Sequence, residues 1–559
     1  MIIKNNRITG ILLVTTIILS GCIKKPDTNT DRKKHNKMPK LVVGIVVDQM
    51  RYDYLTKYWK HYSDNGIKRL MNEGFFFSNA QYDYAPTKTG PGHASIYSGT
   101  SPSVHGIISN GWYTRETGKT TAVVGDTAVE TVGSKTRKGQ ASPHNLLSST
   151  ITDEIRLYNN KHSKTIGVAI KDRAAVLPAG LGGQAYWYDS EAEKIITSTY
   201  YRDNLPDWVN KFNERNLPAE YTSKPWETLL PIESYSESIA DNNPYEGTFK
   251  GEESPTFPHD LPALSKTLGN SVFTDTPFGN TFTFELAYAA IEGENLGQDE
   301  NPDFLAVSFS STDLVGHRFS PTSKEVEDTY IRFDRDLEKF LKYLDDKFGK
   351  DEVLLFLTAD HGANYNPLFL KDEKAHAGIL TPMAMEAKLR KELKAIYGFD
   401  PVHKLDDVHL FLNNDAIRAR KIRHELVQKD AANLLMEIEG VAGALTADAL
   451  RFTTFSDPIR QRVQNGYHVK RSGDVIFWFD PQWATPQWFP TLGKGTIHGS
   501  PWSYDAHIPI IWYGWDIPAG SSTKPVGIID IASTVSSFLN IPYTSGNTGK
   551  PMNHVIYGE

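Results

Sequence analysis

Five short runs of the chain are apolar at nearly every position, and they constrain the fold more than any other feature. They span residues 41–47, 165–170, 304–309, 353–357 and 508–513. A strand with one face in water alternates apolar and polar residues, whereas a parallel strand covered on both faces is apolar throughout. The sequence therefore predicts an α/β fold with a mostly parallel central sheet covered by helices on both faces.

The clearest helix is expected to follow Thr322. Thr322 and Glu325 have the spacing of a capping box, and apolar residues recur every three or four positions as far as Leu344. Gly349 is expected to end this helix. In folds whose strands alternate with such helices along the chain, the active site lies at the carboxyl ends of the strands, so reactive side chains are expected there.

Two long segments, residues 178–301 and 367–495, lie between the expected strands and are rich in Trp, Tyr, Pro and Asn. They are expected to be insertions that form a cap and shape access to the substrate site. No internal repeat is visible, so a solenoid is not indicated. Residues 41–556 are therefore expected to form one catalytic domain with two cap insertions.

The N-terminus has the features of an export signal. Lys4 and Arg7 precede an apolar run that ends in Leu-Ser-Gly-Cys22, which is similar to a bacterial lipobox. About twelve apolar residues are too few to cross a hydrocarbon core that needs about twenty. We expect a signal peptide over residues 1–21, an acylated Cys22, and a flexible tether over residues 22–40. The protein should be exported and lipid-anchored to the bacterial cell envelope, on the periplasmic or outer-membrane face.

Composition excludes several functions. Cys22 is the only cysteine, so the folded chain has neither a disulfide nor a catalytic thiol. The formal net charge of −7 gives no support to nucleic-acid binding. The expected partners are small phosphate esters and the membrane that receives the anchor, and the chain is expected to be a monomer.

Carboxylates and histidines gather where the predicted strands end. They are Asp48, Asp313 with His317, and Asp360 with His361, while His498 adds an imidazole from a distant loop. Mixed oxygen and nitrogen ligands suit zinc, whereas magnesium and calcium favour oxygen alone. Asp313 and His317 would share one helical face and His498 could complete their site. Asp48, Asp360 and His361 would form a second site, so two zinc ions are predicted.

A candidate nucleophile lies in the turn-rich segment from Pro86 to His93. Thr89 would lie near the N-terminus of a following helix, where backbone N–H groups and the helix dipole favour an anion. Coordination to zinc would lower the pKa of its hydroxyl and supply an alkoxide. A threonine that only caps the helix is the alternative interpretation, and Thr87 is the second candidate nucleophile.

These motifs, taken in order, resemble those of the alkaline phosphatase superfamily, and specifically its PafA-type phosphate-irrepressible bacterial alkaline phosphatases. The resemblance covers nearly all of residues 41–556. Its motifs are Val-Val-Asp48-Gln-Met-Arg, the Thr89 turn, Asn110-Gly-Trp-Tyr, Lys171-Asp-Arg173, Ser-Thr-Asp313-x-x-Gly-His317, Ala-Asp360-His361-Gly and His498.

The resemblance implies a role for each motif. It implies that Thr89 attacks phosphorus and briefly carries the phosphoryl group as phosphothreonine. One zinc would be held by Asp48, Asp360 and His361 beside Thr89, and the other by Asp313, His317 and His498. Asn110, Lys171 and Arg173 would contact the phosphoryl oxygens, for which an amide, an ammonium and a guanidinium are suited.

Three alternatives are distinguished by sequence. Paired Lys171 and Arg173 favour a dianionic monoester, whereas a nucleotide pyrophosphatase or phosphodiesterase would keep the metal ligands and the threonine without this pair. A sulfatase would need Cys or Ser in a Cys/Ser-x-Pro-x-Arg motif, which Thr89-Gly-Pro-Gly-His93 does not fit. A non-catalytic lipoprotein that binds ligands through an aromatic cap is the remote alternative. Gly90 and Pro91 depart from the bulkier residues of PafA relatives, which leaves the leaving-group preference open.

Overall fold

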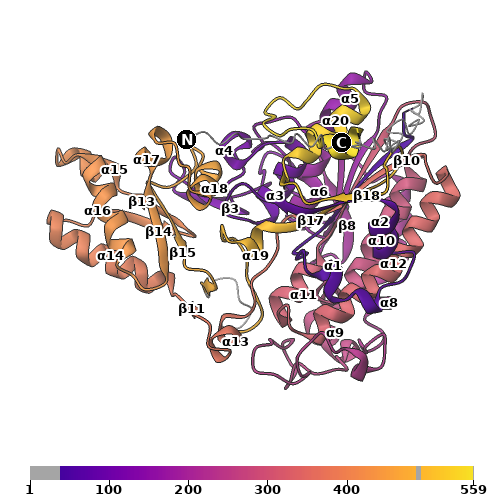
Figure 1. Ribbon diagram of the computed structural model, residues 1–559, viewed down its shortest axis with the longest axis horizontal. Helices are drawn as coiled ribbons and strands as arrows, with labels where there is room; N and C mark the ends of the chain where they lie inside the picture. The colour runs from indigo at the N-terminus through magenta and orange to yellow at the C-terminus, as the bar shows by residue number, and fades with distance from the viewer. Residues whose placement is uncertain (1–37, 486–492, 558–559) are drawn as a thin grey trace, which may run out of the picture. The chain divides into compact units, whose positions relative to one another are not determined.

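The structure is a computed structural model that describes residues 38–485 and 493–557 (Figure 1). The expected signal peptide, Cys22 and most of the expected tether lie outside the described residues. Within the described ranges, no helix combines the length and the apolar character that a membrane crossing requires.

The centre of the fold is a sheet of eleven strands among the described residues. Its order is β18 (Gly520–Ser522), β2 (Phe75–Gln81), β17 (His507–Gly514), β10 (Val353–Thr358), β1 (Leu41–Val47), β9 (Asp303–Phe309), β6 (Thr165–Ala169), β7 (Gln184–Asp189), β8 (Lys194–Ser198) and β5 (Thr131–Val132), with β19 (Val526–Gly527) beside β2. The middle strands β10, β1, β9, β6 and β7 pair in parallel. All residues of β10, β1, β9 and β6 are buried, which confirms the predicted mostly parallel, doubly covered sheet.

One strand runs in the other direction. The sequence predicts residues 508–513 as a parallel strand like the other four, and this is wrong, because β17 pairs antiparallel with both β10 and β2. An apolar run reports that both faces of a strand are covered. It does not report the direction of the strand, since either direction can be buried inside a large sheet.

Different helices cover the two faces of the sheet. Tyr97 of α3 (Thr89–Ser98) packs against Phe304 of β9 at a ring distance of 5.9 Å. Phe284 of α10 (Phe278–Gly293) packs against Phe309 of the same strand at 4.4 Å. Residues five apart on a strand point to opposite faces, so α3 and α10 lie on opposite sides. In Figure 1, α12 (Lys324–Phe348) lies beside α10, and α20 (Asp530–Leu539) lies near α3.

The long helix begins one residue later than predicted. Ser323, not Thr322, is the N-cap of α12, and its hydroxyl accepts a hydrogen bond from the backbone N–H of Val326. Glu325 does not complete a capping box, because the residue at the required position three after Ser323 is Val326. The Glu325 carboxylate instead lies 3.3 Å from a ring nitrogen of buried His259. Gly349 ends the helix with a φ of 102°, as predicted.

The two segments expected as insertions differ in structure. Residues 178–301 include β7 and β8, which belong to the main sheet. Residues 367–495 contain a separate four-stranded sheet, the small sheet, in the order β12 (Val402–Asp406), β13 (His409–Leu412), β15 (Val475–Phe479) and β14 (Val441–Thr446). Helices α14 (Pro382–Tyr397) and α16 (His424–Met436) share an apolar core with it.

Candidate active site

Three neighbouring strands deliver the predicted acidic residues to one edge of the main sheet. Asp48 follows β1, Asp360 follows β10, and Asp313 lies in the first turn of α11 (Ser311–Phe319), just after β9. Because β1 pairs with both β9 and β10, the three carboxylates converge. Thr89 is buried and is the first residue of α3, so the helix begins at Thr89 itself and not after the predicted turn over residues 86–93.

The first predicted ligand group contains three polar atoms with no hydrogen-bond partner among the described residues. They are Asp48 Oδ1, Asp360 Oδ2 and His361 Nε2, and all three residues are fully buried. His361 Nε2 lies 3.4 Å from Asp48 Oδ1 and 3.6 Å from Asp360 Oδ2. Unpaired polar atoms at such depth are costly, and two carboxylate oxygens with one imidazole nitrogen make a set that fits a zinc ion.

The second predicted ligand group also comes together. His317 Nε2 and His498 Nε2 lie 3.1 Å and 3.6 Å from Asp313 Oδ1. Potential ligand atoms of these three residues lie within 4.8 Å of one another, and the same holds for Asp48, Asp313 and His361. Asp313 therefore lies close to both groups, so the two predicted sites are adjacent.

All three imidazoles are oriented in the same way. Nδ1 of His361, His317 and His498 lies 2.8–2.9 Å from the backbone carbonyl oxygens of Gly362, Thr496 and Thr87, respectively. A carbonyl oxygen can only accept, so each Nδ1 carries the proton and donates it. In each ring Nε2 is then the nitrogen that faces the carboxylates, as a metal ligand requires. For His317, burial disfavours the charged ring, but the Asp313 carboxylate outweighs burial and raises the pKa of the ring.

The predicted nucleophile and phosphoryl-binding residues line one cavity of about 190 Å³. Its lining includes Thr89, Asn110, Lys171 and Arg173 together with Asp313, His317 and His498. The Lys171 ammonium lies 2.7 Å from Asp48 Oδ2 and 2.5 Å from Asp313 Oδ2, so it bridges the two ligand groups. Asn110 is oriented by a hydrogen bond that its Oδ1 accepts from the N–H of Gly90, at 2.7 Å.

Burial and charge set the protonation of these groups. Burial, reinforced by Asp313, raises the pKa of Asp48 to about 6. Burial also disfavours the Asp313 carboxylate, but His317 and Lys171 outweigh it and hold the pKa of Asp313 well below its usual range. Burial lowers the pKa of His361 to about 3 and, with His361 as neighbour, moves that of His498 well below its ordinary value. The two rings are therefore neutral near pH 7, with their lone pairs available.

Thr87, the second candidate nucleophile, is placed differently. Its hydroxyl donates to the carbonyl of Ser500 at 2.9 Å, and the residue is not part of the cavity lining. Its contribution to the site is the backbone carbonyl that holds His498.

Sequence reasoning missed two residues that organise the site. Gln49 has a φ of 66°, donates its backbone N–H to Asp360 Oδ1 at 3.1 Å, and donates Nε2 to Asp313 Oδ1 at 2.6 Å. Asp505 Oδ2 accepts from the N–H groups of Gly499 and Ser500, which fixes the loop that carries His498. The position of Gln49 directly after Asp48 was the one available signal, and nothing in the spacing points to Asp505.

The model of the family described as type I phosphodiesterase / nucleotide pyrophosphatase matches residues 42–500 of the chain. A protein of Myroides odoratus named calcium-transporting ATPase is 45% identical over 522 residues, which cover 93% of this chain and 95% of that protein. Alkaline phosphatase PafA of Elizabethkingia meningoseptica is 41% identical over 547 residues, which cover 97% and 98% of the two chains.

Solved structures agree with the sequence relatives. The crystal structure of wild-type alkaline phosphatase PafA matches with a TM-score of 0.89 and 42% identity, over 93% of this chain and 99% of that one. A structure of the same enzyme substituted at one threonine, one asparagine, one lysine and one arginine matches with a TM-score of 0.88 and 41% identity over the same shares.

Proposed function

The chain belongs to the type I phosphodiesterase / nucleotide pyrophosphatase family and, within the alkaline phosphatase superfamily, is an alkaline phosphatase of the PafA type, and we propose a mechanism for it on this basis. We propose that it hydrolyses phosphate monoesters with two zinc ions and through a phosphothreonine intermediate on Thr89. The observation that carries this proposal is the cavity in which Thr89, two cationic side chains and a carboxylate–imidazole cluster meet. A threonine, an asparagine, a lysine and an arginine are also the residue types substituted in the second PafA structure.

Two groups of residues would hold the metal ions. Asp48, Asp360 and His361 would bind one ion together with Thr89, and Asp313, His317 and His498 would bind the other. Bound zinc would supply Lewis acidity that lowers the pKa of a hydroxyl and stabilises negative charge on an ester oxygen. The unpaired atoms of the first group and the neutral, Nδ1-anchored imidazoles support zinc over magnesium.

The chain's own side chains carry out the transfer in two steps. The Thr89 oxygen bonds to phosphorus as the ester oxygen leaves and takes up a proton. Water then attacks the phosphothreonine, which releases phosphate and restores the hydroxyl. Lys171, Arg173 and Asn110 hold the phosphoryl oxygens in both steps. The Lys171 ammonium, which pairs with Asp48 and Asp313 in this structure, would be available to a phosphoryl oxygen if those carboxylates held metal ions.

The same cations favour monoesters over diesters. A monoester brings two negative charges to Lys171 and Arg173, whereas a diester brings one, so the gain from the pair is larger for the monoester. The family description includes diesterases, and the name of the Myroides relative is that of an ATPase. A monoester, a matched diester and ATP therefore form the substrate panel of the test.

The test uses zinc-loaded protein that lacks residues 1–22. We expect strong monoesterase activity, its loss on chelation, and a fall of about a thousandfold or more in kcat for Thr89→Ala. Acid quenching during turnover of a labelled monoester should trap the label on Thr89. The Lys171→Ala/Arg173→Ala variant should lose more monoesterase than diesterase activity.

The matched control is Thr87→Val, which removes the neighbouring hydroxyl but keeps the backbone carbonyl that orients His498. It should retain most of the activity and still become labelled. A parent enzyme that prefers diesters would overturn the monoesterase proposal, and full activity without Thr89 would overturn the intermediate.

We also infer that the mature protein begins at an acylated Cys22 and is held at the cell envelope, on the strength of the signal-like N-terminus. Cys22→Ser in the full chain should move the protein from the membrane fraction to the soluble fraction and abolish incorporation of labelled fatty acid. Unchanged incorporation would contradict the anchor.

A further inference from the structure

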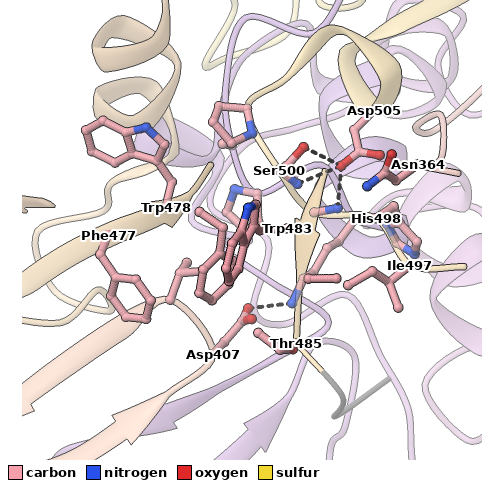
Figure 2. Close-up of a pocket in the computed structure, with 18 of the residues that line it drawn as sticks. Asn364, Asp407, Phe477, Trp478, Trp483, Thr485, Ile497, His498, Ser500 and Asp505 are labelled. Atoms are coloured by element: carbon pink, nitrogen blue, oxygen red, sulfur yellow. Dashed lines mark hydrogen bonds and ion pairs between the residues drawn. The ribbon is translucent and has the colours of Figure 1, made fainter. Parts of the chain in front are cut away.

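A second cavity lies next to the one that contains Thr89. It has a volume of about 60 Å³, and Lys88 and His498 line both cavities. Figure 2 shows Phe477, Trp478 and Trp483 on one side of it and His498, Ser500 and Asp505 on the other. One wall thus comes from the small sheet and the segment after it, and the other comes from the loop of a proposed metal ligand.

The walls are largely aromatic and pre-formed. Trp478 of β15 packs in the cluster that contains Ile476 and Val463, which also line the cavity, and Trp483 and Tyr504 complete the aromatic lining. The rings of Phe477 and Phe479 point to the other face of the strand, into the core shared with α14 and α16. Trp483 packs against two glycines: a Cβ atom at Gly440 would lie 2.2 Å, and one at Gly378 would lie 2.7 Å, from an atom of its ring. The backbone of these two glycines therefore holds the indole in place, and any larger residue at either position would push the ring aside.

The size of the cavity fits one ring. A water-sized group occupies about 10–15 Å³ of such volume. The 60 Å³ cavity therefore has room for about four to six water molecules, which is enough for an aromatic ring. Flat apolar groups gain from contact with aromatic walls both by burial and by ring stacking.

One polar atom of the wall lacks a partner. The indole N–H of Trp483 is buried and makes no hydrogen bond to any residue that the structure describes. Asp505, which is 1% exposed and also lines the cavity, has an Oδ1 atom in the same situation. Because both atoms are buried behind the surface of the wall, the surface that a ligand would contact is mainly apolar.

The position of His498 links this cavity to the reaction. Under the proposed function, Thr89 attacks phosphorus from one side and the leaving oxygen departs from the other. Because Thr89 would share the ion of Asp48, Asp360 and His361, the group of Asp313, His317 and His498 would lie on the departing side. His498 also borders the aromatic cavity. The organic part of the ester would therefore extend past His498 into it.

On the basis of the proposed function, we propose that this cavity binds the leaving group and selects phosphate monoesters whose alcohol carries an aromatic ring. Lys88, held in a buried ion pair with Asp407, forms the border between the phosphoryl and the aromatic cavity. The small sheet thereby determines substrate preference, while the main sheet carries the chemistry.

The experiment compares phenyl phosphate with methyl phosphate. The two esters differ in intrinsic reactivity, but this difference cancels when the kcat/KM of each variant is divided by that of the parent for the same substrate. In Trp483→Ala, the ratio of kcat/KM for phenyl over methyl phosphate should fall about tenfold, because the ring loses a stacking partner and its buried contact. Benzylphosphonate should also lose about tenfold in affinity relative to ethylphosphonate, measured as a dissociation constant.

Two further variants separate the outcomes. Trp59→Ala removes a partly exposed tryptophan that lines neither cavity and should leave both ratios unchanged. Trp478→Leu changes the wall without emptying it and should move both ratios in the same direction as Trp483→Ala, by less. Unchanged ratios in Trp478→Leu and in Trp483→Ala, both shown to be folded by thermal melting, overturn the inference. A parent that hydrolyses neither ester overturns the proposed function instead.

Discussion

The carboxylates at the active edge depend on neighbours that bind no metal themselves. Gln49 contacts two of them, through its backbone N–H to Asp360 and its side chain to Asp313. Outer partners of this kind fix the orientation of metal ligands, and their removal commonly weakens metal binding tenfold or more. A conservative substitution of Gln49 should therefore weaken the predicted metal site without removing any of its ligands.

Gln49→Met keeps the length of the side chain but removes the donor to Asp313. We expect zinc to bind about tenfold more weakly, because one Asp313 oxygen loses its orienting hydrogen bond. Competition with a chromophoric chelator measures the affinity directly and does not depend on turnover. An affinity equal to that of the parent would show that the Gln49 contact does not orient the site.

Residue types and motif order predicted six metal ligands and a nucleophilic threonine. The structure places five of the six candidate ligands in two adjacent clusters, with Asp360 3.6 Å from His361, and places Thr89 in the cavity beside them. The partners of the imidazoles could not be predicted in the same way. Those partners are backbone carbonyls, which every residue carries, so no side chain marks Thr496, Thr87 or Gly362. The placement of Lys171 between Asp48 and Asp313 likewise depends on how three strand ends meet in space.

At the scale of elements, the pattern of apolar residues in the sequence predicted where the buried strands lie. It did not predict the direction of every strand or the residue that caps α12. The bounds of β1, β9 and β10 agree with the apolar runs to within one residue. The direction of β17 depends on a chain reversal far from the strand, which local sequence does not encode. Thr322 and Ser323 are both good capping residues, so the local sequence alone does not decide between them.

The cap of α12 can be tested with two adjacent substitutions. Ser323→Ala removes the acceptor for the N–H of Val326 and should lower the free energy of unfolding by about 1 kcal/mol. Thr322→Ala is the matched control and should cost less, since its hydroxyl lies 3.4 Å from that of Ser320 and does not cap the helix. Urea unfolding of both variants measures the difference, and the reverse order would restore Thr322 as the cap.

At the scale of the whole molecule, stability depends on a buried charge cluster remote from the nucleophile. His259 is fully buried, with its two ring nitrogens 3.0 Å from Glu252 Oε1 and 3.3 Å from Glu325 Oε1. Burial disfavours its charged form, but the two glutamates outweigh burial and raise its pKa to about 9 from an ordinary value of 6.5. The cluster ties the loop around residue 252 to the start of α12.

This cluster predicts a loss of stability in alkali. A raised pKa means that the folded state holds the proton more tightly, so the contribution is complete below pH 6.5 and is lost as the pH rises through about 9. The parent should have a higher free energy of unfolding than His259→Gln at low pH, and this difference should shrink by on the order of 3 kcal/mol as the pH rises across that interval. Urea titrations at several pH values measure it, and a constant or growing difference would contradict the assignment.

Trp483 lies in β16 (Trp483–Ala484), outside the main sheet whose strand ends position Asp48, Asp313 and Asp360. Asp407, in the turn between β12 and β13, pairs with Lys88, the residue before Thr89, and so joins the small sheet to the start of α3. The aromatic cavity and the hydrolytic site can therefore evolve separately. Substitutions in β15 and in the segment after it can change which esters bind, while the residues that carry out hydrolysis stay the same.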